Sequence, residues 1–197
     1  MNELVVATTN QGKLREIKDL LSDFNLKITS LSDYPQIPPI EETGQTFADN
    51  AEIKALTVSH FTGKLTMGED SGLEVQALNN NPGVFSSRYS GPGANDFKNN
   101  QKLLADLTGV PLDQRQACYQ SCVVLARNEK ILSRVQGFCP GIIAMEPKGQ
   151  NGFGYDPLFI IPEYQKTFGE LDPSIKARIS HRSKALQQMR TFLDGYL

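Results

Sequence analysis

The sequence predicts a single globular domain built from both strands and helices, and three observations support this prediction. The chain has 197 residues, which is long enough for one substantial hydrophobic core. Apolar residues make up 39% of it and charged residues 21%, as in folded globular proteins. Residues 1–197 contain no internal repeat, low-complexity tract or linker-like change of composition, so one domain is expected.

Strands and helices alternate in the predicted first half of the chain. Residues 4–8 are apolar and rich in β-branched side chains, which is typical of a buried strand. After the polar residues 9–13, apolar side chains recur at helical spacing over residues 14–24. The same spacing predicts a second helix over residues 46–61.

The second half is expected to hold a half-buried strand, a helix, a two-stranded hairpin, a short strand and a final helix. Side-chain alternation predicts the strands, and apolar residues at helical spacing predict the helices. In that order, the elements cover residues 73–78, 95–107, 117–126 with 131–138, 142–145 and 183–193.

The stretch from Gly68 to Leu73 contains two adjacent carboxylates, Glu69 and Asp70, followed by Ser71. Aspartate, serine and glycine favour turns, so a solvated turn is one interpretation. Neighbouring carboxylates also repel each other and are costly to bury unpaired, so such pairs mark cation or acid–base sites. The stretch by itself supports both interpretations equally.

Residues 8–13 join the first predicted strand to the first helix and are suited to bind phosphate. A helix start capped by Thr9 or Asn10 presents backbone N–H groups and the positive end of the helix dipole, and Lys13 adds a charge. Leu14 stands where a Walker A loop has serine or threonine. An ordinary capped helix with a solvated lysine is the alternative.

Other polar groups lie in the loops and in the C-terminal region. Glu41 and Glu42 precede the second predicted helix, which carries Lys54. Phe153 lies between glycines and is expected either to stack on a base or to enter the core. Residues 176–190 carry several cations and no carboxylate, which predicts either a solvated face or an anion site.

Charge and composition argue against several classes of protein. The net charge of −2 gives no basic field for a nucleic-acid polymer. No apolar stretch approaches the roughly 20 residues that span a membrane, and the N-terminus lacks a signal-peptide pattern. Cys118, Cys122 and Cys139 are expected to be reduced core residues of a cytoplasmic protein rather than zinc ligands.

The carboxylates, the cations and the aromatic loop have one common explanation. Mg²⁺ is typically held by one or two carboxylates together with substrate phosphates, so these groups predict a magnesium site that binds a phosphorylated ligand. Because an aromatic side chain can stack on a base, the expected ligand is a nucleotide.

Six motifs occur in the order found in one known enzyme family. They are Thr9-Asn10-Gln11-Gly12-Lys13-Leu14-Arg15-Glu16-Ile17, Glu41-Glu42-Thr43-Gly44 with Asn50-Ala51 and Lys54-Ala55, Glu69-Asp70-Ser71-Gly72-Leu73, Pro82-Gly83 with Ser87-Arg88-Tyr89-Ser90-Gly91, Gly152-Phe153-Gly154-Tyr155-Asp156-Pro157, and Ser180-His181-Arg182. From about Val5 to Leu193 the chain resembles the noncanonical purine nucleoside triphosphate pyrophosphatases, the RdgB/Ham1-like inosine triphosphatase family. Each motif is weak alone, but six in order make the resemblance specific.

The resemblance implies an α/β fold with an elongated, curved, mixed β-sheet, flanking helices and two lobes that enclose a nucleotide cleft, usually in a homodimer. It implies Mg²⁺-dependent hydrolysis of ITP, dITP and XTP to the monophosphate and pyrophosphate, which cleanses the nucleotide pool. Water would attack the α-phosphorus, while Asp70 would bind Mg²⁺ and orient or deprotonate that water.

The resemblance also implies roles for individual residues. Asp70 and Lys54 would be catalytic, and the metal would be bound by Asp70, Glu42, Glu41 and Glu69. Substrate would be bound by Thr8, Thr9, Asn10, Gln11, Gly12, Lys13, Ser71, Phe153, Gly154, Tyr155, Asp156, Lys176, His181 and Arg182. Glu69 stands where many family members carry aspartate, so its carboxylate reaches about one methylene further.

Three other functions are alternatives. One is a nucleotide-binding regulator without hydrolysis, which the presence of Glu42, Lys54 and Asp70 disfavours. Another is a nucleic-acid-binding protein that uses residues 176–190, which the lack of a wider basic surface disfavours. The third is a related pyrophosphatase for other modified nucleotides.

Overall fold

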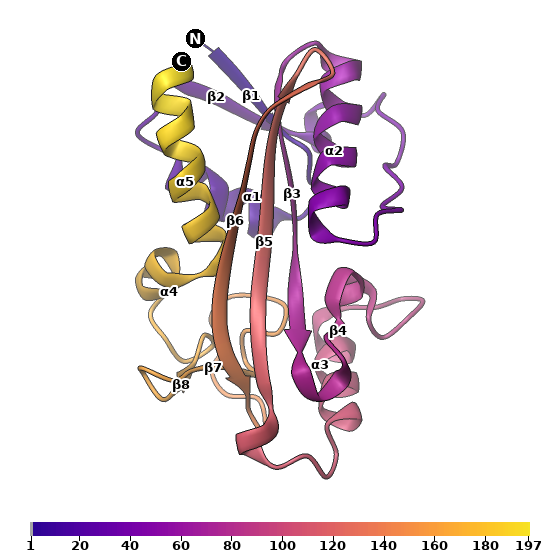
Figure 1. The fold of residues 1–197 in the computed structure, drawn as a ribbon, viewed down its shortest axis with the longest axis vertical. Coiled ribbons are helices and arrows are strands. Elements are labelled where there is room, and N and C mark those ends of the chain that lie inside the picture. The colour runs from indigo at the N-terminus through magenta and orange to yellow at the C-terminus, as the bar shows by residue number, and fades with distance from the viewer. Residues whose placement is uncertain (1) are drawn as a thin grey trace. The chain divides into compact units, whose positions relative to one another are not determined.

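The structure is a computed structural model that describes residues 2–197. Its strands form a mixed sheet in the order β2-β1-β3-β5-β6-β7-β8, and β4 pairs with β3 (Figure 1). Strand β1 is parallel to β2 and β3, whereas β4 and β7 are antiparallel to their partners β3 and β6. The strands are β1 (Asn2–Val6), β2 (Leu26–Ser30), β3 (Leu65–Val75), β4 (Asn81–Pro82), β5 (Gln116–Arg127), β6 (Lys130–Ile143), β7 (Phe159–Ile161) and β8 (Lys166–Thr167).

Five α-helices are present in the described residues 2–197. They are α1 (Gln11–Leu20), α2 (Phe47–Thr62), α3 (Asp96–Asp106), α4 (Pro173–Ile179) and α5 (His181–Tyr196). The expected α/β class with a mixed sheet is confirmed. Within the same part of the chain, no helix has both the length and the apolarity needed to cross a membrane.

The chain divides into two compact units. The first unit comprises Met1–Asp70, Ser121–Gly137 and Arg182–Leu197, and the second unit comprises Ser71–Gln120 and Phe138–His181. Each unit has a hydrophobic core of its own. The core of the second unit is built from β3, α3, β5, β6 and β7 together with the segments that follow β7, and includes Leu73, Leu103, Tyr119, Ile143, Phe159 and Phe168.

In the first unit, the two faces of β1 bury different neighbours. Leu4 and Val6 lie in a core with side chains of α1, β3, β5 and α5. Val5 and Ala7 pack instead with Val58 of α2. Because successive side chains of a strand point to opposite faces, α1 and α5 cover one face of this part of the sheet and α2 covers the other (Figure 1).

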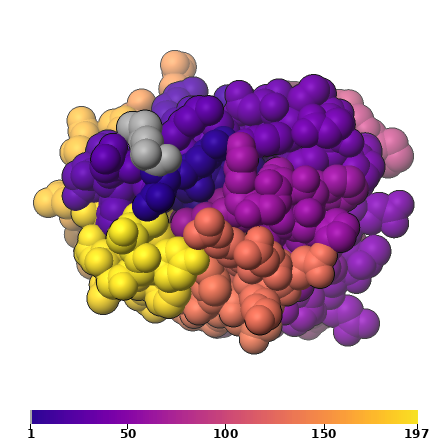
Figure 2. Space-filling view, turned by 90° about the horizontal axis from the view of Figure 1, so that it is seen from above, coloured from indigo at the N-terminus to yellow at the C-terminus, as the bar shows by residue number. Residues whose placement is uncertain are grey.

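Helix α5 packs beside β6 in the first unit. Nε2 of Gln188 donates to the carbonyl oxygen of Gln136 over 2.7 Å, and Figure 2 shows the yellow helix against the coral end of the hairpin. In the same helix, Arg190 forms an ion pair with Asp23, 2.7 Å from Nη1 to Oδ1. This cation of the basic segment 176–190 therefore has a carboxylate partner and does not belong to an open basic surface.

Several elements differ from the sequence prediction. The stretch from Gly68 to Leu73 is neither a turn nor a loop but lies inside β3. β3 lies between β1 and β5 in the sheet, pairs with β1 at residues 65–67 and pairs with β4 at Glu74 and Val75. This pairing on both sides outweighs the local turn preference of aspartate, serine and glycine. The first helix ends at Leu20, and residues 142–143 continue β6 instead of starting a new strand. The second helix, the 95–107 helix and the hairpin agree with the prediction to within a few residues.

Gly68 lies where β3 approaches α2. A Cβ there would overlap the carbonyl oxygen of Ala51 and lie 2.7 Å from the backbone nitrogen of Ala55. We expect Gly68→Ala to lower the free energy of unfolding by about 1–3 kcal/mol, because the strand and helix must separate to fit the methyl group. Urea unfolding measures the change. In Gly195→Ala, the matched control, the methyl meets nothing within 4 Å, so stability should not fall.

Candidate active site

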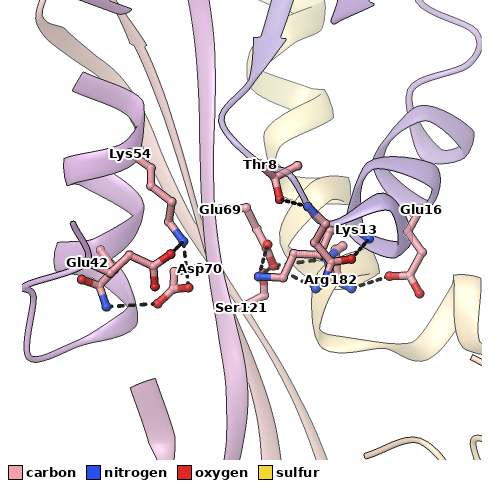
Figure 3. Close-up of polar contacts among 11 residues, drawn as sticks. Thr8, Lys13, Glu16, Glu42, Lys54, Glu69, Asp70, Ser121 and Arg182 are labelled. Carbon is pink, nitrogen blue, oxygen red and sulfur yellow. Dashed lines mark hydrogen bonds and ion pairs between the residues drawn. The ribbon is translucent and has the colours of Figure 1, made fainter. Parts of the chain in front are cut away.

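The adjacent carboxylates Glu69 and Asp70 lie on opposite faces of β3 (Figure 3). Glu69 shares its face with Met67, which lies in the core with α1 and α5, whereas Asp70 shares its face with Gly68, which lies against α2. Both side chains are buried, with exposed fractions of 2% and 6%. The sequence predicts that Glu69 and Asp70 bind one metal together. The structure instead places them on opposite sides of the strand.

Asp70 forms a cluster with residues of α2 and the loop before it. Nζ of Lys54 lies 2.9 Å from Oδ1 of Asp70 and 3.1 Å from Oε1 of Glu42 (Figure 3). Nδ2 of Asn50 donates to Oδ2 of Asp70 over 3.3 Å. One ammonium thus holds two carboxylates in place, and a neutral amide supports one of them.

The electrostatics of this cluster favour a carboxylate that can accept a proton. Burial raises the pKa of Asp70, although the charges of Lys54 and Lys13 oppose the rise. Burial alone would lower the pKa of Lys54, but the charges of Asp70 and Glu42 outweigh it and raise the pKa. Lys54 therefore stays protonated at neutral pH, while Asp70 is a stronger base than an ordinary aspartate.

Glu69 lies in a second cluster on the other face of β3. Oγ of Ser121 donates to its Oε1 over 2.9 Å, and Nη2 of Arg182 lies 3.1 Å from the same oxygen. Nζ of Lys13 lies 2.8 Å from Oε2, and Arg182 also forms an ion pair with Glu16. Burial opposes ionisation of Glu69, but Arg182 and Lys13 outweigh it and hold the pKa of the carboxyl well below its usual value.

The turn before α1 is built as the sequence predicted. Asn10 is the cap of the helix, because its Oδ1 accepts the backbone N–H of Lys13 over 3.1 Å. Oγ1 of Thr8 accepts the N–H of Asn10 over 3.1 Å. The side chains of Thr9, Asn10 and Gln11 are exposed, so this helix start is open to solvent.

Two of the four predicted metal ligands converge. Carboxylate oxygens are the donors that Mg²⁺ prefers, and Asp70 and Glu42 meet at Lys54. Glu41 is exposed, and Glu69 lies in the other cluster. Within residues 2–197, no group of three or more His, Cys, Asp or Glu side chains is arranged to hold a metal ion. The protein donors therefore fit a metal held by two carboxylates together with water or ligand oxygens.

The second unit holds most of the residues predicted to contact the base. Nζ of Lys176 lies 2.6 Å from Oδ2 of Asp156 and 4.5 Å from the ring centroid of Phe153. Oδ2 of Asp156 also accepts the backbone N–H of Phe153 over 2.9 Å. A Cβ at Gly152, where φ is +79°, would meet this carboxylate. The glycine therefore makes room for Asp156, and the ring of Phe153 is half-buried beside Lys176.

Other predicted residues of the second unit are firmly placed. The hydroxyl of Tyr155 donates to the carbonyl oxygen of Ser86 over 2.7 Å, and burial raises its pKa. The backbone N–H of Gly154 donates to Oδ2 of Asp96 over 2.7 Å. The ring of His181 stacks on Tyr119 with centroids 4.7 Å apart, and Ser71 is half-buried in β3. Arg182, in contrast, is held in the first unit by two carboxylates.

Three residues with clear contacts in these clusters, Asn50, Glu16 and Ser121, were given no role from the sequence, although the first two lie in the quoted motifs. Asn50 precedes Lys54 by one helical turn, so the helical spacing could have revealed it. Glu16 follows Lys13 by three residues within α1, a spacing that also places two side chains on one face of a helix. Ser121 reaches Glu69 from β5, and no sequence pattern indicates that contact.

Comparison with known proteins places these features in a family. Residues 4–192 match the profile of the Ham1 family. The chain is 46% identical over 192 residues to the dITP/XTP pyrophosphatase of Desulforamulus reducens, covering 98% of this chain and 96% of that protein. It is 45% identical over 187 residues to the dITP/XTP pyrophosphatase of Streptococcus agalactiae, covering 94% of this chain but only 58% of the longer relative.

A solved structure has the same fold. The HAM1 protein from Coxiella burnetii superimposes with a TM-score of 0.90 and 44% sequence identity, over 99% of this chain and 100% of that chain. The family profile and the relative from Desulforamulus reducens both extend over nearly the whole chain. The chain therefore belongs to the Ham1 family.

Proposed function

We propose that this protein hydrolyses the triphosphates of deaminated purines, dITP, XTP and ITP, to the monophosphate and pyrophosphate. The observation that carries the proposal is the buried Asp70, paired with Lys54 over 2.9 Å in a chain of the Ham1 family. Pyrophosphate release from dITP, XTP, ITP, GTP, dTTP and ATP, each with Mg²⁺, tests it. The proposal is contradicted if the protein hydrolyses neither dITP nor XTP nor ITP. If it prefers another nucleotide of the panel, that nucleotide is the substrate.

The reaction follows from the Asp70 cluster. The oxygen of a water molecule forms a bond to the α-phosphorus, the bond between that phosphorus and the oxygen bridging to the β-phosphate breaks, and pyrophosphate leaves. Asp70 accepts the proton of the attacking water, since it is the buried carboxylate that Lys54 and Asn50 hold in place. The ammonium of Lys54 orients Asp70 and offsets the negative charge of the phosphate oxygens.

Magnesium is the cofactor that fits the donor set. We assign Asp70 and Glu42 as its protein ligands, because both carboxylates meet at Lys54. When bound, Mg²⁺ supplies positive charge beside the phosphate oxygens and lowers the pKa of a bound water. Glu69 is not assigned to the metal, since Arg182 and Lys13 already neutralise it.

We assign substrate contacts to residues of each unit separately. In the first unit, residues 8–13 bind the triphosphate through the open start of α1 and the charge of Lys13. In the second unit, the nucleoside is bound by Ser71, Phe153, Gly154, Tyr155, Asp156, Lys176 and His181. A donor among these that pairs with O6 of hypoxanthine or xanthine is left unpaired by the N6 amine of adenine, which costs about 1–3 kcal/mol. Arg182, held by two carboxylates, is not included.

Lys54→Met tests the role of the ammonium. We expect kcat for dITP to fall by about 10²–10³-fold, because a positive charge beside the reacting phosphate is lost and two carboxylates are left to repel each other. Steady-state pyrophosphate release measures the change. Lys130→Met, at an exposed position, is the matched control and should retain the wild-type rate. Equal rates in both variants would remove Lys54 from the mechanism.

Assembly and location complete the proposal. We infer a homodimer that acts in the cytoplasm on the free nucleotide pool. The mass in solution from sedimentation or light scattering tests the first point, since a monomer at micromolar concentration would contradict it. Fractionation of cells with an antibody against the native protein tests the second.

A further inference from the structure

Asn50 connects the two carboxylates of the Asp70 cluster, although it touches only one of them. Its side chain is completely buried, with an exposed fraction of 0%. Oδ1 accepts the backbone N–H of Gly44 over 2.8 Å, and Nδ2 donates to Oδ2 of Asp70 over 3.3 Å. Only one orientation of the amide satisfies both partners, because the N–H of Gly44 needs an acceptor and the carboxylate needs a donor.

The contact to Gly44 fastens the loop that carries Glu42. Gly44 lies against the first turn of α2, where an added Cβ would come within 2.6 Å of Oδ1 of Asn50. Two residues later, Thr46 caps the helix, with its Oγ1 accepting the N–H of Asp49 over 3.1 Å. Asn50 therefore holds the loop at a point two residues from Glu42, inside the capped start of the helix.

The same helix presents Lys54 one turn further on. Residues four apart on a helix lie on the same face, so Asn50 and Lys54 both face Asp70. Asn50 donates to the carboxylate without adding a charge, whereas Lys54 supplies the charge. The two residues thus make different contacts: Lys54 pairs with both carboxylates, whereas Asn50 touches Asp70 and the loop that carries Glu42.

We propose that Asn50 is a positioning residue of the active site, whose amide orients Asp70 and anchors the Glu42 loop so that both carboxylates face one point. This inference rests on the proposed function, which needs Asp70 and Glu42 to bind one metal ion and Asp70 to act as the base. Mutation of a residue that orients a metal ligand typically lowers metal affinity or activity by about 10–100-fold. A buried asparagine that serves folding alone would affect stability but not turnover.

Two substitutions separate the two contacts. Asn50→Ala removes both, so we expect kcat for dITP to fall about 10–100-fold and the Mg²⁺ concentration for half-maximal rate to rise. We also expect the amide proton of Gly44 to exchange with solvent faster, since its acceptor is lost. Asn50→Asp keeps the shape and the acceptor for Gly44 but places a carboxylate against Asp70, so kcat should fall while the amide of Gly44 stays protected.

Ser59→Ala is the matched control on the same helix. Ser59 is also completely buried, and its hydroxyl accepts the backbone N–H of Glu129 over 3.4 Å. This variant should lose some stability to urea but keep the wild-type kcat and the protection of Gly44. Wild-type kcat in both Asn50 variants would overturn the inference. So would unchanged exchange of Gly44 in Asn50→Ala.

The measurements distinguish this inference from the proposed function. If the wild-type protein releases no pyrophosphate from dITP, XTP or ITP, the proposed function fails and the catalytic part of this inference fails with it. Hydrogen exchange at Gly44 needs neither substrate nor metal, so it reports the anchoring of the loop in either case. If Asn50→Ala does not fold, Asn50→Asp still decides the matter, since it predicts lost turnover with retained protection of Gly44.

Discussion

Asp70→Asn is expected to lower the rate of pyrophosphate release from dITP by about 10²–10⁴-fold, the range typical of a lost general base. Asparagine keeps the shape of the side chain but accepts no proton and binds Mg²⁺ more weakly than a carboxylate does. Single-turnover measurements with saturating dITP and Mg²⁺ report the chemical step directly. Urea unfolding in parallel shows whether the variant is folded.

The stability of Asp70→Asn can be predicted from the sign of the pKa shift. Burial raises the pKa of Asp70 on folding, so the folded state binds its proton more tightly than the unfolded state does. Ionisation of this carboxylate therefore opposes folding as the pH rises above the unfolded pKa, and its removal should cost little stability at pH 7. Asp113→Asn, at an exposed position, is the control and should leave the rate unchanged. Near-normal turnover by folded Asp70→Asn would refute the mechanism.

Glu69→Gln is expected to cause the largest loss of stability, about 3–5 kcal/mol, because it leaves the buried Arg182 and the half-buried Lys13 with too little negative charge. The carboxylate lies 3.1 Å from Arg182 and 2.8 Å from Lys13, and its exposed fraction is 2%. Urea unfolding at pH 7 measures the change. Glu129→Gln is the control for the same substitution at an exposed glutamate, which contacts His60, and should change stability little. A similar, small change in both variants would contradict the prediction.

The difference between wild type and Glu69→Gln should also depend on pH. The pKa of Glu69 is held well below its usual value of 4.5 in the folded state, so its ionisation stabilises the fold above that pH. As the pH falls below 4.5 towards the folded pKa, the wild-type protein loses this contribution and the glutamine variant does not. The stability gap should therefore be constant at neutral pH and shrink in acid.

The two carboxylates adjacent in sequence thus have different expected roles. Asp70 faces α2 and Lys54, where loss of the carboxylate removes chemistry and little stability. Glu69 faces α1 and α5, where loss of the carboxylate removes stability first, since it neutralises Arg182 and Lys13. Glu69 affects turnover only through the position of Lys13, with which it pairs.

The sequence by itself determined the local structure and the set of candidate residues. Helical periodicity predicts α2, and alternation with a tight turn predicts the β5–β6 hairpin. The polar residues after the first strand predict a cap at Thr9 or Asn10, of which the structure selects Asn10. These features depend on neighbours within a few positions, so they can be read along the chain. The motif resemblance selected Asp70, Lys54 and Glu42, which the structure brings together.

Only the tertiary structure decided how those residues are grouped. Gly68–Leu73 becomes part of a strand because β3 lies inside the sheet, between β1 and β5, and these neighbours are far away in sequence. Local turn preferences carry no information about such distant partners. The alternation of that strand then sends Glu69 and Asp70 to opposite faces, one towards α1 and α5 and the other towards α2. Long-range packing therefore assigned Arg182 to Glu69 and Asn50 to Asp70, because each pair meets only after distant elements have packed on the two faces of β3.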